Sequence, residues 1–230
     1  VIASSYDHEA LQLTHLDIFL ALAAHVPNQA GTALVENYYT HWNQVNPALP
    51  NRVIEILGPP PTSGTRDAFL ELVMEVGAAQ VPLVMAFGGA EGAELVELMR
   101  ASGLGEMTDM VAGGADGDDI EGALSHSIRE DGVFVETGEN DNLIVQKLNA
   151  NSEAMGIFGY SFLDQNSDSV QGHFIEGVAP EFDAIADGSY SVSRPLYVYV
   201  KAQHAEVIPG MQEFIDEFTS ERAWGDDGYL

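Results

Sequence analysis

Two kinds of hydrophobic pattern alternate along the chain. Residues 52–57 alternate β-branched and polar positions, as a strand does, whereas apolar residues in 66–76 return at the three- and four-residue spacing of a helix. Further strands are expected at 1–4, 132–135 and 192–201, and further helices from Thr14 and at 91–99, 142–148 and 209–218. This order predicts an α/β fold with helices on both faces of a sheet.

Some positions are expected to pack closely and others to be exposed. Two glycines within the apolar run 155–160 indicate close backbone packing. Residues 105–122 are rich in glycine and aspartate and are expected to be an exposed excursion. In the helix at 209–218 we expect the apolar side chains to point inward; these are Met211, Phe214, Ile215 and Phe218.

Composition excludes several classes of function. The 230 residues are 46% hydrophobic, enough for a core, and carry a formal charge of −28, which argues against a nucleic-acid partner. Apolar stretches fall short of the roughly 20 residues that span a bilayer. There is no cysteine, and the histidines lack metal-ligand spacing, so neither a metal nor another cofactor is expected. Such an acidic, lysine-poor surface suits salty surroundings.

A short polar loop between a predicted strand and a predicted helix is the best candidate for chemistry. Three prolines at 59–61 end the strand, and Thr62, Ser63, Gly64 and Thr65 follow immediately before the helix. The first N–H groups of a helix have no internal partner and lie at its positive end, so they favour an anion. The serine and threonine hydroxyls add donors, and glycine lets a ligand approach the backbone. An ordinary helix cap explains the same residues.

Two further positions extend this candidate site. Arg66 offers a planar set of charged donors one residue beyond the loop, and we assign it to the anion on geometry. Asn140 and Asp141 open the helix predicted at 142–148 and could face the same ligand, although capping that helix is the favoured role. The acidic run at 116–119 lacks the spacing of a calcium loop and is interpreted as a solvated turn.

Motifs spread along the chain resemble those of phosphate-binding proteins of high-affinity ABC uptake systems. The loop resembles that family's G-P-P-x-T-S-G-T-R-D-A-F segment. Residues 138–142 with 155–160 resemble its G-x-N-D segment and return strand, and 185–190 with 193–197 resemble its late D-G-x-Y-x-x-S-R-P-L segment. These matches occur in the family's order and cover nearly the whole chain.

The resemblance implies a type II periplasmic-binding fold, in which two α/β lobes are joined by hinge strands. Residues 1–155 would then be mostly lobe two, and residues 156–230 the return hinge strand and the C-terminal part of lobe one. The family's opening strand and helix, which carry an aspartate that accepts the proton of hydrogen phosphate, have no counterpart, so lobe one is expected to be incomplete. The family's ligand contacts match this sequence at Ser63, Gly64 and Thr65. In some relatives an arginine before the loop also contacts the ligand, but Pro59 stands at that position here.

The implied function is extracytoplasmic capture of inorganic phosphate by a monomer, with delivery to an ABC permease and no catalysis. The export signal would be outside this sequence. Two alternatives remain at this point. One is a serine-dependent phosphatase or hydrolase with Ser63 as nucleophile, although T-S-G-T is not the G-x-S-x-G pattern. The other is an extracellular interaction domain without a transport role.

Overall fold

A five-stranded sheet organises the larger part of the chain. The computed structural model describes residues 1–138, 140–195, 197–205 and 207–225, and contacts divide the chain into units Val1–Ser193 and Arg194–Leu230. The sheet order is β6-β5-β7-β1-β8. These strands are β6 Phe134–Glu136, β5 Ile56–Gly58, β7 Met155–Ile157, β1 Ile2–Ser5 and β8 Val170–Gly172. β5 is parallel to both β6 and β7, whereas β1 is antiparallel to β7 and β8.

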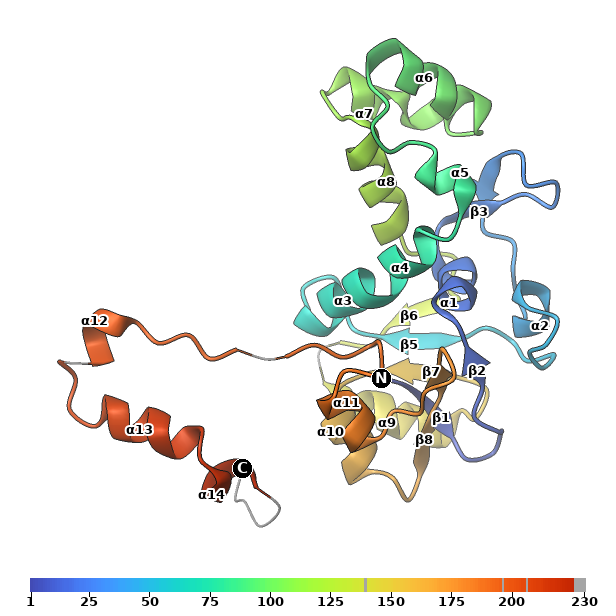
Figure 1. Cartoon of the computed structure of the whole chain (residues 1–230). Coiled ribbons are helices and arrows are strands. Elements are labelled where there is room, and N and C mark those ends of the chain that lie inside the picture. Colours follow the sequence, from blue (N-terminus) through green and yellow to red (C-terminus); the bar gives the residue numbers. More distant parts are fainter. Residues whose placement is uncertain (139, 196, 206, 226–230) are drawn as a thin grey trace. The chain divides into compact units, whose positions relative to one another are not determined.

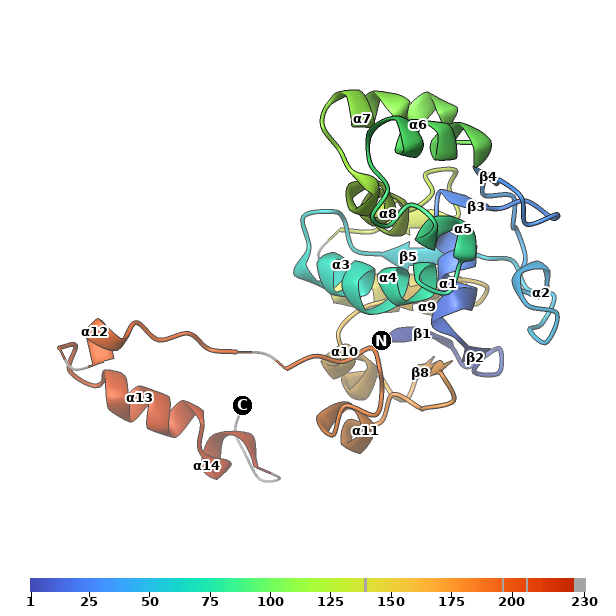
Figure 2. The same ribbon diagram turned by 45° about the horizontal axis from the view of Figure 1, so that its top comes forward.

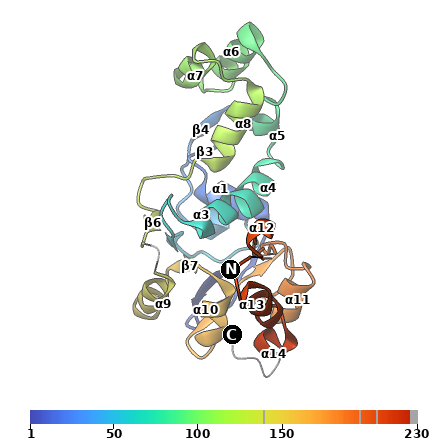
Figure 3. The same cartoon turned by 90° about the vertical axis from the view of Figure 1, so that its left-hand side faces the viewer.

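Helices cover both faces of this sheet, as the sequence predicted (Figures 1 and 3). On one face lie α1 (His15–Leu22) and a helical run of α3 (Gly64–Phe69), a π-turn (Leu70–Met74) and α4 (Glu75–Ala78). On the other face lie α9 (Asp141–Ala150) and α10 (Tyr160–Gln165). Successive residues of a strand point to opposite faces, so Ile56 joins the first core and Leu57 the second.

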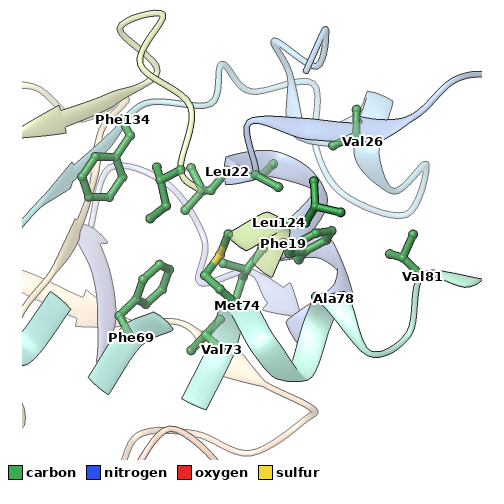
Figure 4. Packing of buried hydrophobic residues seen from close by; sticks show 14 of the residues in the cluster. Phe19, Leu22, Val26, Phe69, Val73, Met74, Ala78, Val81, Leu124 and Phe134 are labelled. Carbon is green, nitrogen blue, oxygen red and sulfur yellow. The ribbon is translucent and has the colours of Figure 1, made fainter. Parts of the chain in front are cut away.

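The first core is the larger of the two. Figure 4 shows Phe69, Val73 and Met74 from the helical run beside Phe19 and Leu22 of α1. The second core holds Ile144 and Leu148 of α9, and Gly156 lies so close that an added Cβ would be 2.6 Å from Ile144 Cγ2. The close packing predicted at residues 155–160 is therefore confirmed at Gly156.

The remaining elements extend this unit. Two small ladders are formed by β2 (Gln12–Leu13) with β9 (Phe174–Ile175) and by β3 (His25–Pro27) with β4 (Leu34–Glu36). The other helices are α2 (Trp42–Val45), α5 (Pro82–Met85), α6 (Gly92–Ala101), a 3-10 turn (Gly105–Thr108), α7 (Asp109–Ala112), α8 (Gly117–His126) and α11 (Phe182–Ala186). Figures 1 and 2 show α6 and α7 at the opposite end of the unit from α10 and α11. No helix among the described residues is long and apolar enough to cross a membrane.

Several expectations for individual segments were wrong. The glycine- and aspartate-rich stretch at 105–122 is exposed over much of its length, as expected, but it is largely helical, and Asp116 caps α8 through a hydrogen bond from the Asp119 N–H. A strand was expected at 192–201, but none occurs in the described residues of this range. Pro195 lacks the backbone N–H that a strand would donate to its neighbour. The Arg194–Leu230 unit contains α12 (Ala202–Ala205), α13 (Met211–Phe218) and α14 (Glu221–Trp224), but Phe214 of α13 is 62% exposed. The predicted division into 1–155 and 156–230 stays a prediction.

A buried histidine connects β8 to the loop before α1. His173 has no exposed surface, and its Nδ1 accepts a hydrogen bond of 2.9 Å from the backbone N–H of Leu11, so its proton is on Nε2. Burial and the neighbouring Arg52 lower the pKa of His173 to about 3. The guanidinium of Arg52 donates to the carbonyls of Ser152, Glu153 and Ala154. The imidazole is therefore a neutral part of the core.

This histidine should make folding stability depend on pH. In the unfolded chain the imidazole titrates near pH 6.5, so between that pH and about 3 the unfolded state binds an extra proton. The contribution of the neutral His173 to the free energy of unfolding is complete above pH 6.5 and is lost as the pH falls. Between pH 7 and pH 5 the loss is about 2 kcal/mol. Urea unfolding of the wild type and His173→Asn measures this, since asparagine keeps an acceptor and does not titrate. Equal pH slopes for the two proteins would contradict it.

Candidate anion-binding site

Three parallel strands end together at one edge of the sheet. β6, β5 and β7 are adjacent and parallel, so the loops that leave their carboxyl ends lie side by side. The loop after β5 leads to α3 on one face, and the loop after neighbouring β6 leads to α9 on the other (Figure 3). Adjacent connections that leave toward opposite faces create a crevice where open α/β sheets bind ligands. Fold topology therefore selects the same loop as the sequence did.

Ser63 fixes the beginning of the helical run that starts at α3. Its backbone N–H donates to the Pro60 carbonyl at 3.0 Å, and its own carbonyl accepts from Arg66 N at 2.9 Å. Its Oγ accepts from the Thr65 N–H at 3.2 Å. The helix cap expected from sequence is confirmed. Because Oγ acts as an acceptor here, the hydroxyl proton of Ser63 is left to donate elsewhere.

Three donors remain available at this helix start. The backbone N–H of Gly64 has no hydrogen-bond partner in the described part of the chain, and the hydroxyls of Ser63 and Thr65 carry protons. An added Cβ on Gly64 would meet nothing within 4 Å, so its backbone faces open space. The helical run continues through the π-turn to Ala78, and its dipole favours negative charge at this end. Thr62, also predicted as a contact, is exposed in the same loop.

Arg66 lies beneath the loop. Its side chain is buried, one guanidinium nitrogen donates to the Pro59 carbonyl at 3.3 Å, and the guanidinium carbon is 4.6 Å from the centre of the Phe134 ring. Burial lowers the pKa of Arg66 below its ordinary value, and the nearby Glu136 carboxylate offsets part of this decrease. These contacts connect the β5–α3 loop to β6. Direct contact between Arg66 and an anion stays a prediction.

The loop after β6 leaves the sheet beside the loop after β5. Thr137 donates to the Gly58 carbonyl through both its backbone N–H, at 2.9 Å, and its Oγ1, at 3.1 Å. Asn140 caps α9 by accepting a hydrogen bond from the Asn142 N–H, as the favoured interpretation expected. Asp141 accepts from the Gly159 N–H at 3.2 Å and so connects this loop to the one after β7. Contact of Asn140 or Asp141 with a ligand stays a prediction.

The sequence did not reveal the supporting role of Phe134 and Thr137. Both belong to β6 or its loop. They reach the loop at residues 62–66, called the anion loop below, because Ile56 pairs with Phe134 in the parallel register. Gly58 is also part of this arrangement: an added Cβ there would be 2.3 Å from Phe134 Cζ. A small residue ending one strand and an aromatic residue in the next were the available signals, but they do not specify the pairing.

The geometry does not support Ser63 as a catalytic nucleophile. A serine hydrolase needs a base within hydrogen-bond reach of the serine oxygen. Among the described residues no imidazole or carboxylate hydrogen-bonds to the Ser63 hydroxyl. The described contacts of Ser63 are those of a helix cap.

Comparison with known proteins identifies the family. The chain belongs to the PBP superfamily domain family, whose model matches residues 1–222. Its fold resembles two crystal structures. One, of a possible phosphate binding protein from Planctomyces limnophilus, has a TM-score of 0.54 and 20% identity, covering 96% of this chain and 58% of that one. The other, PstS from Borrelia burgdorferi, has a TM-score of 0.51 and 13% identity, covering 95% and 62%. The predicted periplasmic-binding-protein type of fold is confirmed.

Curated relatives match shorter parts of the chain at higher identity. The phosphate-binding protein PstS of Staphylococcus haemolyticus is 37% identical over 106 residues, covering 43% of this chain and 33% of that protein. The PstS of Staphylococcus saprophyticus is 26% identical over 179 residues, covering 76% and 39%. The matches thus span between 33% and 39% of the length of these two relatives.

The contact between Gly58 and Phe134 can be tested by mutation. Gly58→Ala should force the ring away from Arg66 and lower the free energy of unfolding by about 1–3 kcal/mol, measured by urea denaturation. Phe134→Leu should lower the free energy of unfolding less in the Gly58→Ala background than in the wild type, because the smaller side chain relieves the overlap with the added methyl group. Gly122→Ala in α8 is the matched control, because an added Cβ there meets nothing within 4 Å. This change should raise the free energy of unfolding by about 0.5–1 kcal/mol. Additive effects of the first two changes would contradict this contact.

Proposed function

We propose that the loop from Thr62 to Arg66 binds inorganic phosphate and that the protein delivers it to an ABC permease. The observation that carries this proposal is the group of donors at Ser63, Gly64 and Thr65, uncommitted within the described residues and located at the start of a helical run at the switch point of the sheet. The names of the relatives, phosphate-binding proteins, support phosphate over other oxyanions.

Local contacts can hold an anion despite a formal charge of −28. Charges farther away than about 10 Å are screened at ordinary ionic strength, whereas N–H and O–H groups in direct contact with a ligand are not. Arg66 adds a positive charge beneath the loop, where its stacking on Phe134 keeps it in place. In this proposal the arginine both supports the loop and favours the phosphate charge.

The same proposal includes the cellular setting. A substrate-binding protein of this family would act outside the cytoplasm as a monomer and would hold phosphate without breaking a bond at Ser63. The donors described here form one wall of the site. In this proposal Asn140 and Asp141 belong to the neighbouring wall, where contacts with α9 and with Gly159 hold them.

Calorimetry with phosphate, arsenate and sulfate tests the binding proposal. The wild type should bind phosphate, and Ser63→Ala or Thr65→Val should weaken its affinity about 10- to 100-fold, the effect of losing one hydrogen bond to a charged group. Asp116→Ala is the matched control, because it also removes a helix cap but does so at α8, far from the loop along the chain. The phosphate affinity of this variant should equal that of the wild type.

Two results would count against the proposal. One is the absence of phosphate binding by the wild type at millimolar phosphate. The other is hydrolysis of 4-nitrophenyl phosphate that disappears in Ser63→Ala, since this would assign Ser63 to catalysis.

A further inference from the structure

A serine, a histidine and a glutamate that are distant in sequence form a continuous hydrogen-bonded row away from the anion loop. Ser191 Oγ is 3.1 Å from His15 Nε2, and His15 Nδ1 is 2.9 Å from Glu176 Oε1. Both distances fall in the range that joins a nucleophile to its base and the base to the group that orients it. The three residues come from α1, from the end of β9 and from the segment after α11.

The carboxylate determines which imidazole nitrogen holds the proton. An ionised carboxylate only accepts hydrogen bonds, so Nδ1 of the neutral ring must donate to Glu176, and Nε2 is left as an acceptor toward Ser191. The backbone N–H of His15 lowers the pKa of the Glu176 carboxyl, and the imidazole lowers it further. Glu176 therefore stays ionised near neutral pH. This is the tautomer that a serine nucleophile requires.

Rigid elements hold the histidine and the glutamate. His15 is the first residue of α1, whose capping box joins Thr14 to Asp17, and its side chain is buried. Glu176 follows β9 directly, and its backbone N–H donates to the Leu13 carbonyl at 2.9 Å. With φ at 50°, Glu176 is the one residue other than glycine with a left-handed backbone among those described. This conformation belongs to a two-residue turn with Gly177, whose φ is 79°. The flanking residues Ile175 and Val178 exchange two backbone hydrogen bonds of 3.0 Å, so the turn fixes the backbone from which the Glu176 carboxylate extends.

Ser191 is exposed but its segment is anchored. The neighbouring Tyr190 is fully buried, and its backbone N–H donates to the Ala184 carbonyl at 2.8 Å. Ser193 Oγ donates to the Tyr190 carbonyl at 2.8 Å. The backbone N–H of Val192, directly after the serine, has no partner in the described part of the chain. In serine hydrolases the N–H after the nucleophile stabilises the oxyanion, and Val192 offers this donor.

We propose that Ser191, His15 and Glu176 form a second, hydrolytic site that cleaves small carboxylic esters. Ser191 Oγ attacks the ester carbonyl carbon while its proton passes to His15 Nε2. The bond to the alcohol oxygen breaks, and the alcohol leaves with that proton, so the acyl group is bound to Ser191. Water then gives a proton to Nε2 as its oxygen attacks the acyl carbon. The acid departs, and the proton returns to Ser191 Oγ.

The exposed position of Ser191 restricts the substrate. An open serine contacts the acyl end of a small ester and leaves most of a larger substrate in water. Acetate esters with a good leaving group fit this geometry, because they need neither a deep acyl pocket nor protonation of a strongly basic alkoxide. Ser191 and His15 are the catalytic residues, and Glu176 is a positioning residue.

Covalent labelling tests whether Ser191 is activated. A fluorophosphonate probe should label the wild-type chain, and peptide mass spectrometry should locate the adduct on Ser191. Ser191→Ala should abolish the label. Ser167→Ala, at an exposed serine after α10, and Ser63→Ala, at the start of α3, should keep it, which makes this result independent of phosphate binding. No label on the wild type, or a label on another serine, would overturn the proposal.

Turnover of 4-nitrophenyl acetate tests the full reaction. Ser191→Ala should reduce kcat/KM to the level of uncatalysed hydrolysis, whereas Ser167→Ala should leave it unchanged. Glu176→Gln should lower kcat about 100-fold or more with little change in KM, since the amide no longer enforces the imidazole tautomer. The far-ultraviolet circular dichroism and urea midpoint of Glu176→Gln check that the protein remains folded. Turnover that survives Ser191→Ala, or a Glu176→Gln effect confined to KM, would contradict the mechanism.

Discussion

Parallel pairing of β5 with both β6 and β7 is the constraint on which the rest of the structure depends. It brings three carboxyl strand ends to one edge, and burial on both faces requires helices above and below the sheet. The connections after β5 and β6 leave toward opposite faces, which is the position where open α/β sheets bind ligands. Gly58 is central to this pairing, because its carbonyl accepts both hydrogen bonds from Thr137 and its missing side chain makes room for Phe134.

Arginine has a structural role at three buried positions of this acidic protein. Arg66 stacks on Phe134 beneath the anion loop, and Arg52 donates to a run of carbonyls before β7. Arg129 donates to the carbonyls of Ala21, Asn37 and Tyr39 and pairs with Asp131. A planar guanidinium with five donors can satisfy several backbone carbonyls that a turn leaves unpaired. Three of the eight lysines and arginines thus lie inside the fold and hold loops together.

Both proposed sites combine helix starts with polar groups supplied by other segments. In the anion loop, Ser63 caps the helical run, and its neighbours have donors to spare. At the start of α1, the cap is complete within the helix, and Glu176 adds a carboxylate that holds both the backbone N–H and the imidazole of His15. The first arrangement suits an incoming anion. The second already contains its own anion, which is why it can orient a base.

The sequence by itself determined several local elements and the helix start at Ser63. Helical periodicity located α3, α6 and α9, and the Thr14, Ser63 and Asn140 caps were evident because capping depends on residues a few positions apart. It did not show the helices in 105–122, and it placed the apolar side chains of α13 inward. Only the tertiary structure decided the register that joins Phe134 to Gly58 and Arg66, and the meeting of Ser191, His15 and Glu176. The physical reason is separation along the chain, since contacts made through sheet pairing and loop packing leave no periodic signal in any one segment.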